Sequence, residues 1–227
     1  MIDYDVILQR TGIDARNLEQ GSEGWKALRL GVITASRAHC VIATGRSGNG
    51  WGEKKKGYLM ELVAEVCTGQ SPEIFGKPLE WGNNHEDEAR SLFEFTTGKQ
   101  VSTVPIIFKD EGMRTAASPD GLVDDGNGLE IKCPFTTPVY LDFRVNGEIK
   151  PEYIAQCQFS MWVTDRQGWN FANYDPRMKR EAIHYVTLDR DEKMIRQFDE
   201  HIPEFVSAMD GVLSDLGFVF GEQWRLP

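Results

Sequence analysis

The sequence predicts an α/β fold in which a mixed central β-sheet is flanked by helices. Three observations lead to this class: strand-like segments gather in the middle of the chain, helical segments precede and follow them, and one helix separates the first strands from the last two. That order is typical of a sheet covered by helices rather than of a bundle or a sandwich. No repeat or long linker divides the 227 residues, so we expect a single domain over residues 1–227.

The segments before the sheet are predicted to be mainly helical. Ser36 is expected to cap a helix that runs to about Ala43, and Gly98 to end an amphipathic helix whose apolar side includes Ala89 and Phe93. In chain order, we expect helices over residues 23–30, 36–43, 57–69 and 83–98, with an extended segment at 32–36.

The middle of the chain carries the strand signals. Residues 101–108, 113–118 and 129–134 are rich in apolar and β-branched side chains, and Asp-Asp-Gly-Asn-Gly supplies a turn before the third segment. A helix over residues 152–164 follows, then strands at 168–174 and 182–188, then a long helix from about Asp191 to Val212.

Composition restricts the class of protein. No apolar run approaches the roughly 20 residues of a membrane span, and the N-terminus lacks the pattern of a secretory signal, so we expect a cytoplasmic protein that contacts no membrane. The four cysteines and four histidines are scattered, which disfavours zinc, redox and histidine-metal sites. The net charge of −10 argues against a uniformly basic surface, but basic clusters at 54–56 and 177–180 remain compatible with a local polyanion groove. Taken alone, these clusters are better interpreted as solvated surface charges.

The stretch from Ser118 to Pro134 contains the candidate chemistry. Side chains alternate along a strand, so Glu130 and Lys132 share one face while the apolar neighbours face the other way and pack on a helix. Asp120 precedes the glycine-rich turn and is expected close enough to Glu130 for both carboxylates to hold one cation.

Two carboxylates suit Mg²⁺, which prefers oxygen ligands and usually keeps several waters. The carbonyl of Ile131 is a further candidate ligand, and Lys132 beside the metal would activate a water or stabilise charge on a phosphate. Glu86, in the preceding helix, is a candidate for a second metal site. A short pattern of this kind also fits a surface hairpin with solvated Glu130 and Lys132, and that alternative is favoured when the motif is considered without its context.

Beyond the motif itself, the chain resembles the PD-(D/E)XK nuclease superfamily and, within it, the viral recombinase and alkaline exonuclease family to which phage lambda exonuclease belongs. The resemblance rests on Glu86, the Ser-Pro-Asp-Gly lead-in, Glu130-Ile-Lys132 and Gln156. It extends through LRLGVITAS, EDEARSLFEFTTG, QFSMWVT, FANYDPRMKRE and GFVFGEQWR, from Leu28 to Arg225. The superfamily fold is the restriction-endonuclease-like mixed sheet flanked by helices.

The resemblance implies a processive, Mg²⁺-dependent exonuclease that degrades one strand of linear duplex DNA from 5′ to 3′, releases mononucleotides and leaves a 3′ overhang. It implies two Mg²⁺ ions, with Mn²⁺ as a substitute, held by Asp120, Glu130, Ile131 and Glu86. Lys132 would act on the nucleophilic water, and Gln156 would orient that lysine or the water.

The same resemblance assigns contacts with DNA. Arg29, Ser36 and Ser118 would bind the 5′-phosphate, a task that suits the planar fork of arginine. Without it, Arg29 reads as an ordinary charge at a helix end. Leu79 would wedge between the separating strands, although a loop leucine packed on the core is an equal alternative. Lys77, Arg46 and Tyr153 would face the DNA.

The family also implies a ring-shaped homotrimer around DNA and a partner protein that anneals single strands. The loop at residues 44–56 and the segment 136–152 depart from the family pattern, which leaves their DNA contacts open. The catalytic motif alone also fits an endonuclease of the same superfamily, and a catalytically inactive DNA clamp or scaffold is a third reading.

Overall fold

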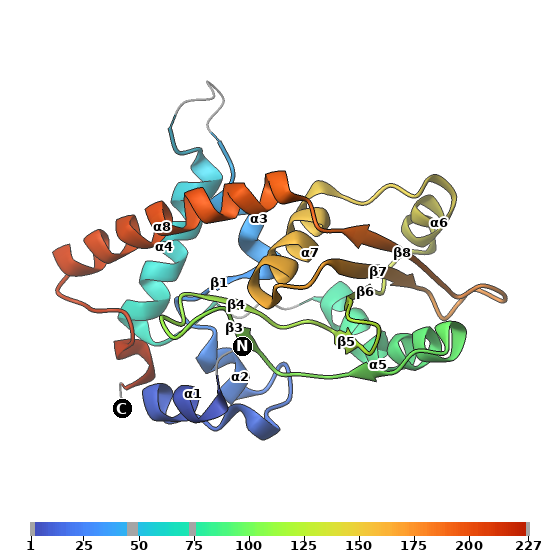
Figure 1. Cartoon of the computed structure of the whole chain (residues 1–227), viewed down its shortest axis with the longest axis horizontal. Coiled ribbons are helices and arrows are strands. Elements are labelled where there is room, and N and C mark those ends of the chain that lie inside the picture. The colour runs from blue at the N-terminus through green and yellow to red at the C-terminus, as the bar shows by residue number, and fades with distance from the viewer. Residues whose placement is uncertain (1–2, 45–49, 73–75, 226–227) are drawn as a thin grey trace.

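The structure, a computed structural model, describes residues 3–44, 50–72 and 76–225 (Figure 1). The α-helices are α1 (Tyr4–Thr11), α2 (Glu23–Leu28), α3 (Ala38–Val41), α4 (Glu53–Thr68), α5 (Lys77–Thr97), α6 (Thr137–Asn146), α7 (Pro151–Thr164) and α8 (Glu192–Asp215). The strands are β1 (Ile33–Thr34), β2 (Val101–Ser102), β3 (Ile107–Phe108), β4 (Thr115–Ala117), β5 (Gly121–Val123), β6 (Gly128–Lys132), β7 (Gly168–Tyr174) and β8 (Ile183–Asp189). Short 3₁₀ turns in these ranges are η1 (Ala15–Asn17), η2 (Ala35–Arg37) and η3 (Glu222–Trp224).

The mixed α/β class is confirmed, but the strands form two sheets instead of one. The larger sheet has the order β2-β5-β6-β7-β8, in which only the β6–β7 pair is parallel. The smaller sheet has the order β1-β4-β3, with β1 parallel to β4. Between β2 and β5 the chain changes sheet at Pro105 and at Pro119, where proline has no N–H to continue a ladder. The predicted strand at 101–108 is therefore split into β2 and β3.

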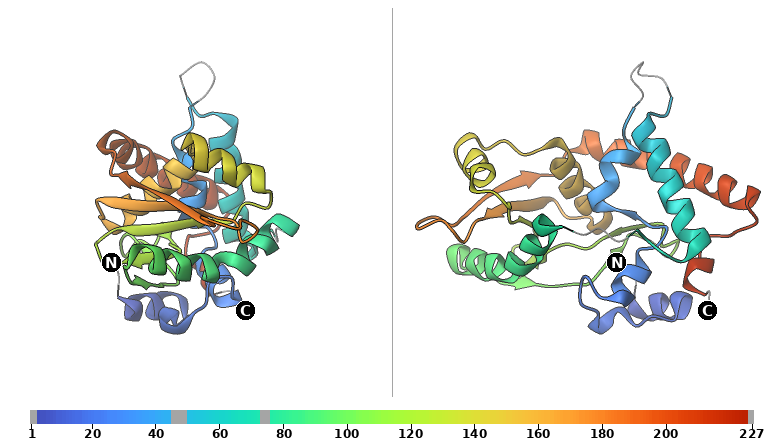
Figure 2. Two further views of the ribbon diagram at one scale, coloured as in Figure 1. Left: turned by 90° about the vertical axis from the view of Figure 1, so that its right-hand side faces the viewer. Right: turned by 180° about the vertical axis from the view of Figure 1, so that it is seen from behind.

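Helices cover both faces of the larger sheet (Figures 1 and 2). On one face, Ala89 and Phe93 of α5 pack on Leu129 and Ile131 of β6. On the other face, Cys157 and Met161 of α7 are among the side chains that pack on β7. The alternation predicted for β6 is confirmed, since Leu129 and Ile131 face α5 while Glu130 faces α7.

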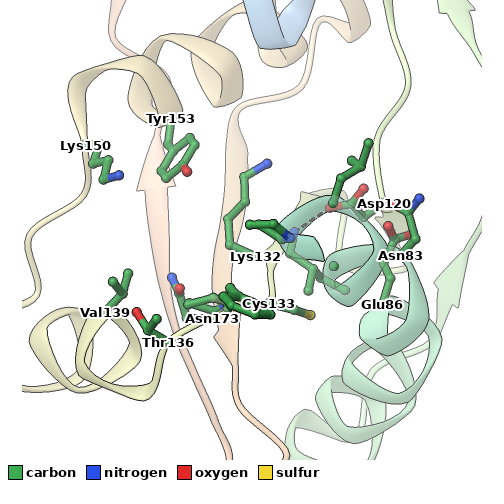
Figure 3. A pocket seen from close by; sticks show the side chains of 16 residues that line it. Asn83, Glu86, Asp120, Lys132, Cys133, Thr136, Val139, Lys150, Tyr153 and Asn173 are labelled. Atoms are coloured by element: carbon green, nitrogen blue, oxygen red, sulfur yellow. Dashed lines mark hydrogen bonds between the residues drawn. The ribbon is translucent and has the colours of Figure 1, made fainter. Parts of the chain in front are cut away.

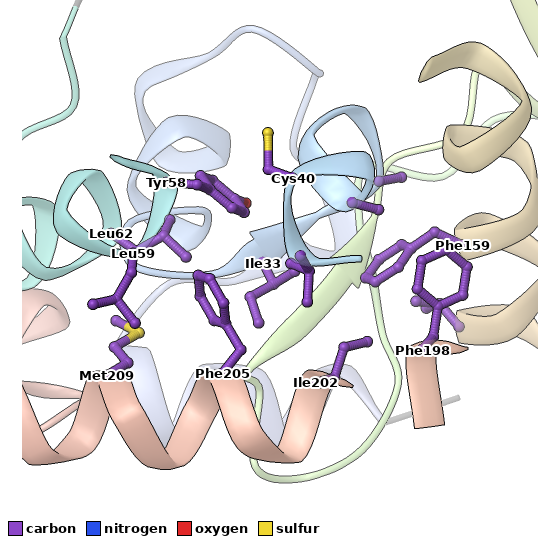
Figure 4. Close-up of a cluster of buried hydrophobic side chains, with 14 of the residues drawn as sticks. Ile33, Cys40, Tyr58, Leu59, Leu62, Phe159, Phe198, Ile202, Phe205 and Met209 are labelled. Carbon is purple, nitrogen blue, oxygen red and sulfur yellow. The ribbon is translucent and has the colours of Figure 1, made fainter. Parts of the chain in front are cut away.

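The largest apolar cluster lies beside the smaller sheet, where α3, α4, α7 and α8 meet (Figure 4). Its centre includes Tyr58 of α4, Phe159 of α7 and Phe198 and Phe205 of α8, all nearly or fully buried. This cluster fixes α7 between the two sheets, so that the side chains of α7 have a defined position over β6.

Several element boundaries differ from prediction. The segment predicted as a helix capped by Ser36 is η2 followed by α3, and residue Thr34 precedes it without a side-chain cap. The predicted limits of β7 are confirmed, and α8 begins after Asp191, which caps it through the backbone N–H groups of Lys193 and Met194. Helix α6 and strand β5 were not predicted.

All four cysteines are free thiols, of which Cys40 and Cys157 are buried. Within the described ranges, no helix has both the length and the apolar character needed to cross a membrane.

Candidate active site

A cavity of about 580 Å³ opens beside β6 (Figure 3). It is bounded by α5, the start of β5, the end of β6, the residues leading into α6 and the start of α7. Its lining is Pro78, Leu79, Gly82, Asn83, Glu86, Asp120, Ile131, Lys132, Cys133, Pro134, Phe135, Thr136, Val139, Lys150, Tyr153 and Asn173.

Glu130 and Lys132 form the first part of the site. The Lys132 Nζ lies 2.5 Å from Glu130 Oε1, and Gln156 Nε2 of α7 donates to the same oxygen at 2.6 Å. Glu130 is only 2% exposed, so this carboxylate is held by two donors away from bulk water. Burial alone lowers the pKa of Lys132, but the charges of Glu130 and Asp120 outweigh it and keep the pKa above its ordinary value. Lys132 is therefore a cation at neutral pH.

Asp120 lies between β4 and β5 and reaches across to β6. Its Oδ2 accepts a hydrogen bond of 2.5 Å from the backbone N–H of Ile131. Burial, together with the nearby Glu130 and Glu86 carboxylates, raises the pKa of Asp120 well above its ordinary value. Acidic groups that raise one another's pKa in this way are characteristic of sites that await a cation or a proton.

Glu86 is positioned by a residue that the sequence analysis did not identify. Arg90, one turn later in α5, donates to Glu86 Oε1 at 2.6 Å and to Asp87 Oδ1 at 2.6 Å, and its Nε donates to the backbone carbonyl of Asp120 at 2.8 Å. Burial raises the pKa of Glu86, although the charge of Arg90 opposes the shift. The i, i+4 spacing of Glu86 and Arg90 was a signal in the sequence, whereas the bond to Asp120 depends on the tertiary fold.

The donor set fits a hard cation that keeps some of its own water. Asp120, Glu130 and Glu86 offer carboxylate oxygens, and their mutual repulsion is the kind that a divalent ion relieves. Across the described residues, no three His, Cys, Asp or Glu side chains converge into a closed metal-binding group. Carboxylate oxygens are the ligands that Mg²⁺ prefers, and Mg²⁺ usually takes one or two of them beside its waters.

Arg29 and Ser118 meet at a second polar site. Arg29 Nη1 donates to Ser118 Oγ at 3.3 Å, and the guanidinium lies 4.1 Å from the centre of the Trp25 ring. The Trp25 indole N–H donates to Ser118 Oγ at 3.1 Å and to the carbonyl of Pro105 at 3.0 Å. Burial lowers the pKa of Arg29 from its ordinary value, yet an arginine remains charged. The role of Trp25 had no signal in the sequence.

The other residues predicted to contact DNA are spread over several elements and lie in different surroundings. Leu79 is 48% exposed at the rim of the cavity, Lys77 is exposed at the start of α5, and the Tyr153 ring lies 5.0 Å from Lys132 Nζ. Ser36 is exposed in η2, and in the described part of the chain no hydrogen bond joins it to Arg29 or Ser118. Arg46 lies outside the described residues.

The basic clusters are largely exposed, as predicted for surface charges: Lys55 is the buried member of the first cluster, while Lys54, Lys56, Arg177, Lys179 and Arg180 are exposed. Lys55 is 3% exposed, and its Nζ lies 3.2 Å from Glu204 of α8. Arg177 is bound to Asp175 and to the backbone after β6. The charges of Lys55 and Arg177 are therefore already paired within the chain, although Arg177 stays partly exposed.

The chain is similar to known proteins of one family. Residues 24–167 match the YqaJ-like viral recombinase domain, which is more than half of the chain. The chain belongs to the YqaJ-like viral recombinase family. The ExoD protein of Escherichia coli K12 is 58% identical over 87 residues, which cover 37% of this chain and all of that protein.

Solved structures extend the relationship across most of the YqaJ-like chain. LHK-Exo, an alkaline exonuclease from Laribacter hongkongensis solved in complex with dAMP, is 32% identical with a TM-score of 0.76, covering 86% of this chain and 96% of that one. A phage-related exonuclease from Haemophilus somnus has a TM-score of 0.66 at 16% identity, covering 82% of this chain and 96% of that one, and shows the shared fold. The predicted resemblance to the lambda-type alkaline exonuclease family and its nuclease fold is therefore confirmed.

Proposed function

We propose that this protein is a Mg²⁺-dependent exonuclease that digests one strand of linear duplex DNA processively from the 5′ end, releases mononucleotides and leaves a 3′ overhang for recombination. One observation carries the proposal: Asp120 and Lys132 line a single cavity, and the buried Glu130 pairs with Lys132 and raises the pKa of Asp120, in a chain of the alkaline exonuclease family. Bound Mg²⁺, held by Asp120, Glu130, the Ile131 carbonyl and Glu86, would supply Lewis acidity and neutralise charge at the phosphate, and Mn²⁺ has similar ligand preferences.

The chain's own residues supply the remaining chemistry. Because its pKa lies above the ordinary value, Lys132 keeps its proton and acts as a cationic donor that orients water and stabilises negative charge on the phosphate. Gln156 donates to the same Glu130 oxygen as Lys132 and thereby limits the rotation of that carboxylate. The Tyr153 ring packs near Lys132 and narrows the positions available to its ammonium group.

The second polar site explains a preference for DNA ends. Arg29 is fixed over Trp25 and points its guanidinium at Ser118, so its donors are oriented before an anion arrives. Ser118 and Asp120 are separated by a single residue, which ties the Arg29 site to the acidic site. A 5′-terminal phosphate bound at Arg29 and Ser118, with the exposed Ser36 as a further contact, would place a following phosphodiester near Asp120. Leu79, Lys77, Arg46 and Tyr153 would contact the DNA beyond that point.

The test uses linear duplex DNA carrying either a 5′-phosphate or a 5′-hydroxyl, with and without Mg²⁺, and covalently closed circles as a control. We expect mononucleotides and a growing 3′ overhang from the phosphorylated linear DNA only when Mg²⁺ is present. Cleavage of closed circles would favour an endonuclease, and the absence of cleavage from every substrate would favour a DNA clamp.

The family resemblance also supports a homotrimer that encloses duplex DNA and a partner that anneals the exposed single strand. A ring would reconcile the net charge of −10 with DNA binding, because the residues that face the channel are a small part of the surface. Sedimentation of the purified protein tests the assembly, and a monomer at micromolar concentration would contradict it.

A further inference from the structure

Phe135 is an aromatic side chain that remains 42% exposed within the cavity of the acidic site. It follows Lys132, the last residue of β6, by three positions, so the strand that carries the acidic site also sets its place. Leu79 and Val139, each 48% exposed, line the same cavity. The cavity thus has an apolar part and, with Glu86 and Asp120, an acidic part.

The backbone of Phe135 is held by an ion pair that has no role in the acidic site itself. Arg177 donates to the Phe135 carbonyl at 2.9 Å and to the Pro134 carbonyl at 3.1 Å. The same guanidinium is paired with Asp175, whose carboxylate is fully buried. A buried acid, an arginine and two carbonyls therefore fix the segment on which the exposed ring stands.

The ring of Phe135 has a further support from α5. The Trp81 and Phe135 rings are perpendicular, with centroids 6.1 Å apart, and the Arg177 guanidinium lies 4.5 Å from the centre of the Trp81 ring. Edge contacts of this kind orient an aromatic ring without covering all of its surface. Arg177 thus supports the Phe135 backbone directly and the Phe135 ring through Trp81, while part of the ring surface stays exposed for contact with a ligand.

We propose that Phe135 stacks on the base of the nucleotide whose phosphate lies at the acidic site. This inference rests on the proposed function, since it assigns a nucleobase to the apolar part of the same cavity. A nucleotide has an anionic part and a flat aromatic part, and the two parts of the cavity match them. The volume of about 580 Å³ lies within the roughly 300–1,000 Å³ range of small-molecule pockets. Leu79 and Val139 are apolar but offer no ring face. Tyr153 also lines the cavity, but its ring is stacked on Phe171 and faces Lys132, so stacking on a base falls to Phe135.

Calorimetric titration of dAMP and of 2-deoxyribose 5-phosphate, both with Mg²⁺, measures the contribution of the base directly. Neither compound contains a phosphodiester, so the result does not depend on cleavage. We expect the wild-type protein to bind dAMP more tightly than the sugar phosphate by roughly 5- to 150-fold, the range for one stacked base.

The ratio of the two dissociation constants is the readout for variants. Phe135→Ala should bring the ratio close to one, Phe135→Leu should lower it while keeping an apolar side chain, and Phe135→Tyr should keep it. Phe95→Ala is the matched control, because Phe95 is 87% exposed on α5 and does not line the cavity. That variant should retain the wild-type ratio.

An unchanged ratio in Phe135→Ala and Phe135→Leu would overturn the proposal, as would equal binding of the two compounds by the wild-type protein. A change of oligomeric state in Phe135→Ala with an unchanged ratio would assign the ring to a contact between copies of the chain and would also overturn it. Failure of the exonuclease proposal has a separate signature, namely intact duplex DNA despite a normal preference for dAMP.

Discussion

The two polar sites on either side of Pro119 are built on opposite electrostatic principles. The acidic site groups Asp120, Glu130 and Glu86, and burial together with mutual repulsion raises the pKa values of Asp120 and Glu86. The site at Ser118 instead gathers donors, from Arg29 and Trp25, around one hydroxyl. The first arrangement would be relieved by a cation and the second by an anion, which is the pairing of ligands that we propose for the two sites.

The difference also lies in how each site is supported. Three consecutive residues that join the two sheets are each held by a different side chain: Ser118 by Arg29, the Pro119 carbonyl by Gln20 at 2.9 Å, and the Asp120 carbonyl by Arg90 at 2.8 Å. The two sites thus share one rigid connection. Substitutions on either side should therefore separate binding of a cation from recognition of a DNA end.

Lys132→Ala should have the largest effect and act on the acidic site alone. Removal of a cation that stabilises the transition state costs several kcal/mol, so we expect cleavage of linear duplex to fall by about a thousandfold or more. Duplex binding should change little. Lys99→Ala is a matched control, because Lys99 pairs with Asp125 and does not line the cavity. Wild-type turnover in Lys132→Ala would remove the role assigned to this lysine.

Arg90→Leu should weaken the response to Mg²⁺ without altering selection of the 5′ end. Arg90 touches Glu86 and the Asp120 backbone but no DNA in our proposal, and loss of such a supporting residue typically lowers metal affinity by about 10- to 100-fold. The Mg²⁺ concentration at half-maximal activity measures this effect. Arg144→Leu, which removes an exposed pair with Glu181, should leave that concentration unchanged.

Arg29→Ala should weaken recognition of the 5′-phosphate at the Ser118 site without altering the response to Mg²⁺. A hydrogen bond to a charged group contributes about 1.5–3 kcal/mol, so the preference for a 5′-phosphate over a 5′-hydroxyl end should fall at least about tenfold. The Mg²⁺ response should stay as in the wild type. Arg16→Ala, at an exposed pair with Asp14, is the control. A lost Mg²⁺ response in Arg29→Ala would show that the two sites are not separable.

The acidic site could be predicted from the sequence more fully than the polar site at Ser118. Glu130 and Lys132 belong to one strand, so the period of two predicted their shared face, and the structure places both next to Gln156. The Ser118 site joins residues 89 positions apart, and nothing in local periodicity relates Arg29 to Ser118. Only the family resemblance brought those two residues together.

The elements that the sequence analysis missed, and the division into two sheets, also have physical explanations. Strand β5 has only three residues between turn-forming neighbours, too few for an alternating pattern to show. Helix α6 carried signals that were missed, with Pro138 in its first turn and Gly147 in the left-handed conformation at its end. The division into two sheets depends on Pro105 and Pro119, whose effect on pairing is determined by the partner strands.

Asp120→Asn should stabilise the protein in the absence of metal, which tests the claim that the acidic site is electrostatically unfavourable by itself. A carboxyl whose folded pKa is raised contributes stability that is fully present below its ordinary pKa of 3.8 and is lost as the pH rises through the raised value. The amide carries no such charge, so at neutral pH we expect a gain of about 1 kcal/mol. Urea unfolding in EDTA between pH 4 and 8 measures it.

The wild-type protein should lose stability across that pH range relative to Asp120→Asn, and added Mg²⁺ should reverse the order because only the wild-type carboxylate binds it well. Equal stability of the two proteins at every pH would show that the acidic groups do not repel one another appreciably.

Lys77→Ala should have the smallest effect. It tests whether a lysine on the surrounding surface contributes to DNA affinity without contributing to either polar site. Lys77 is exposed at the first residue of α5, two residues before Leu79, so a contact with DNA would be a solvated one to the backbone. We expect duplex affinity to fall about two- to threefold, with unchanged Mg²⁺ response and unchanged preference for the 5′-phosphate. Because one phosphate contact contributes about one unit to the dependence of log affinity on log salt, that slope should decrease by about one. An unaltered slope, measured by fluorescence anisotropy from 50 to 200 mM salt, would place Lys77 away from the DNA and leave the selection of ends to Arg29 and Ser118.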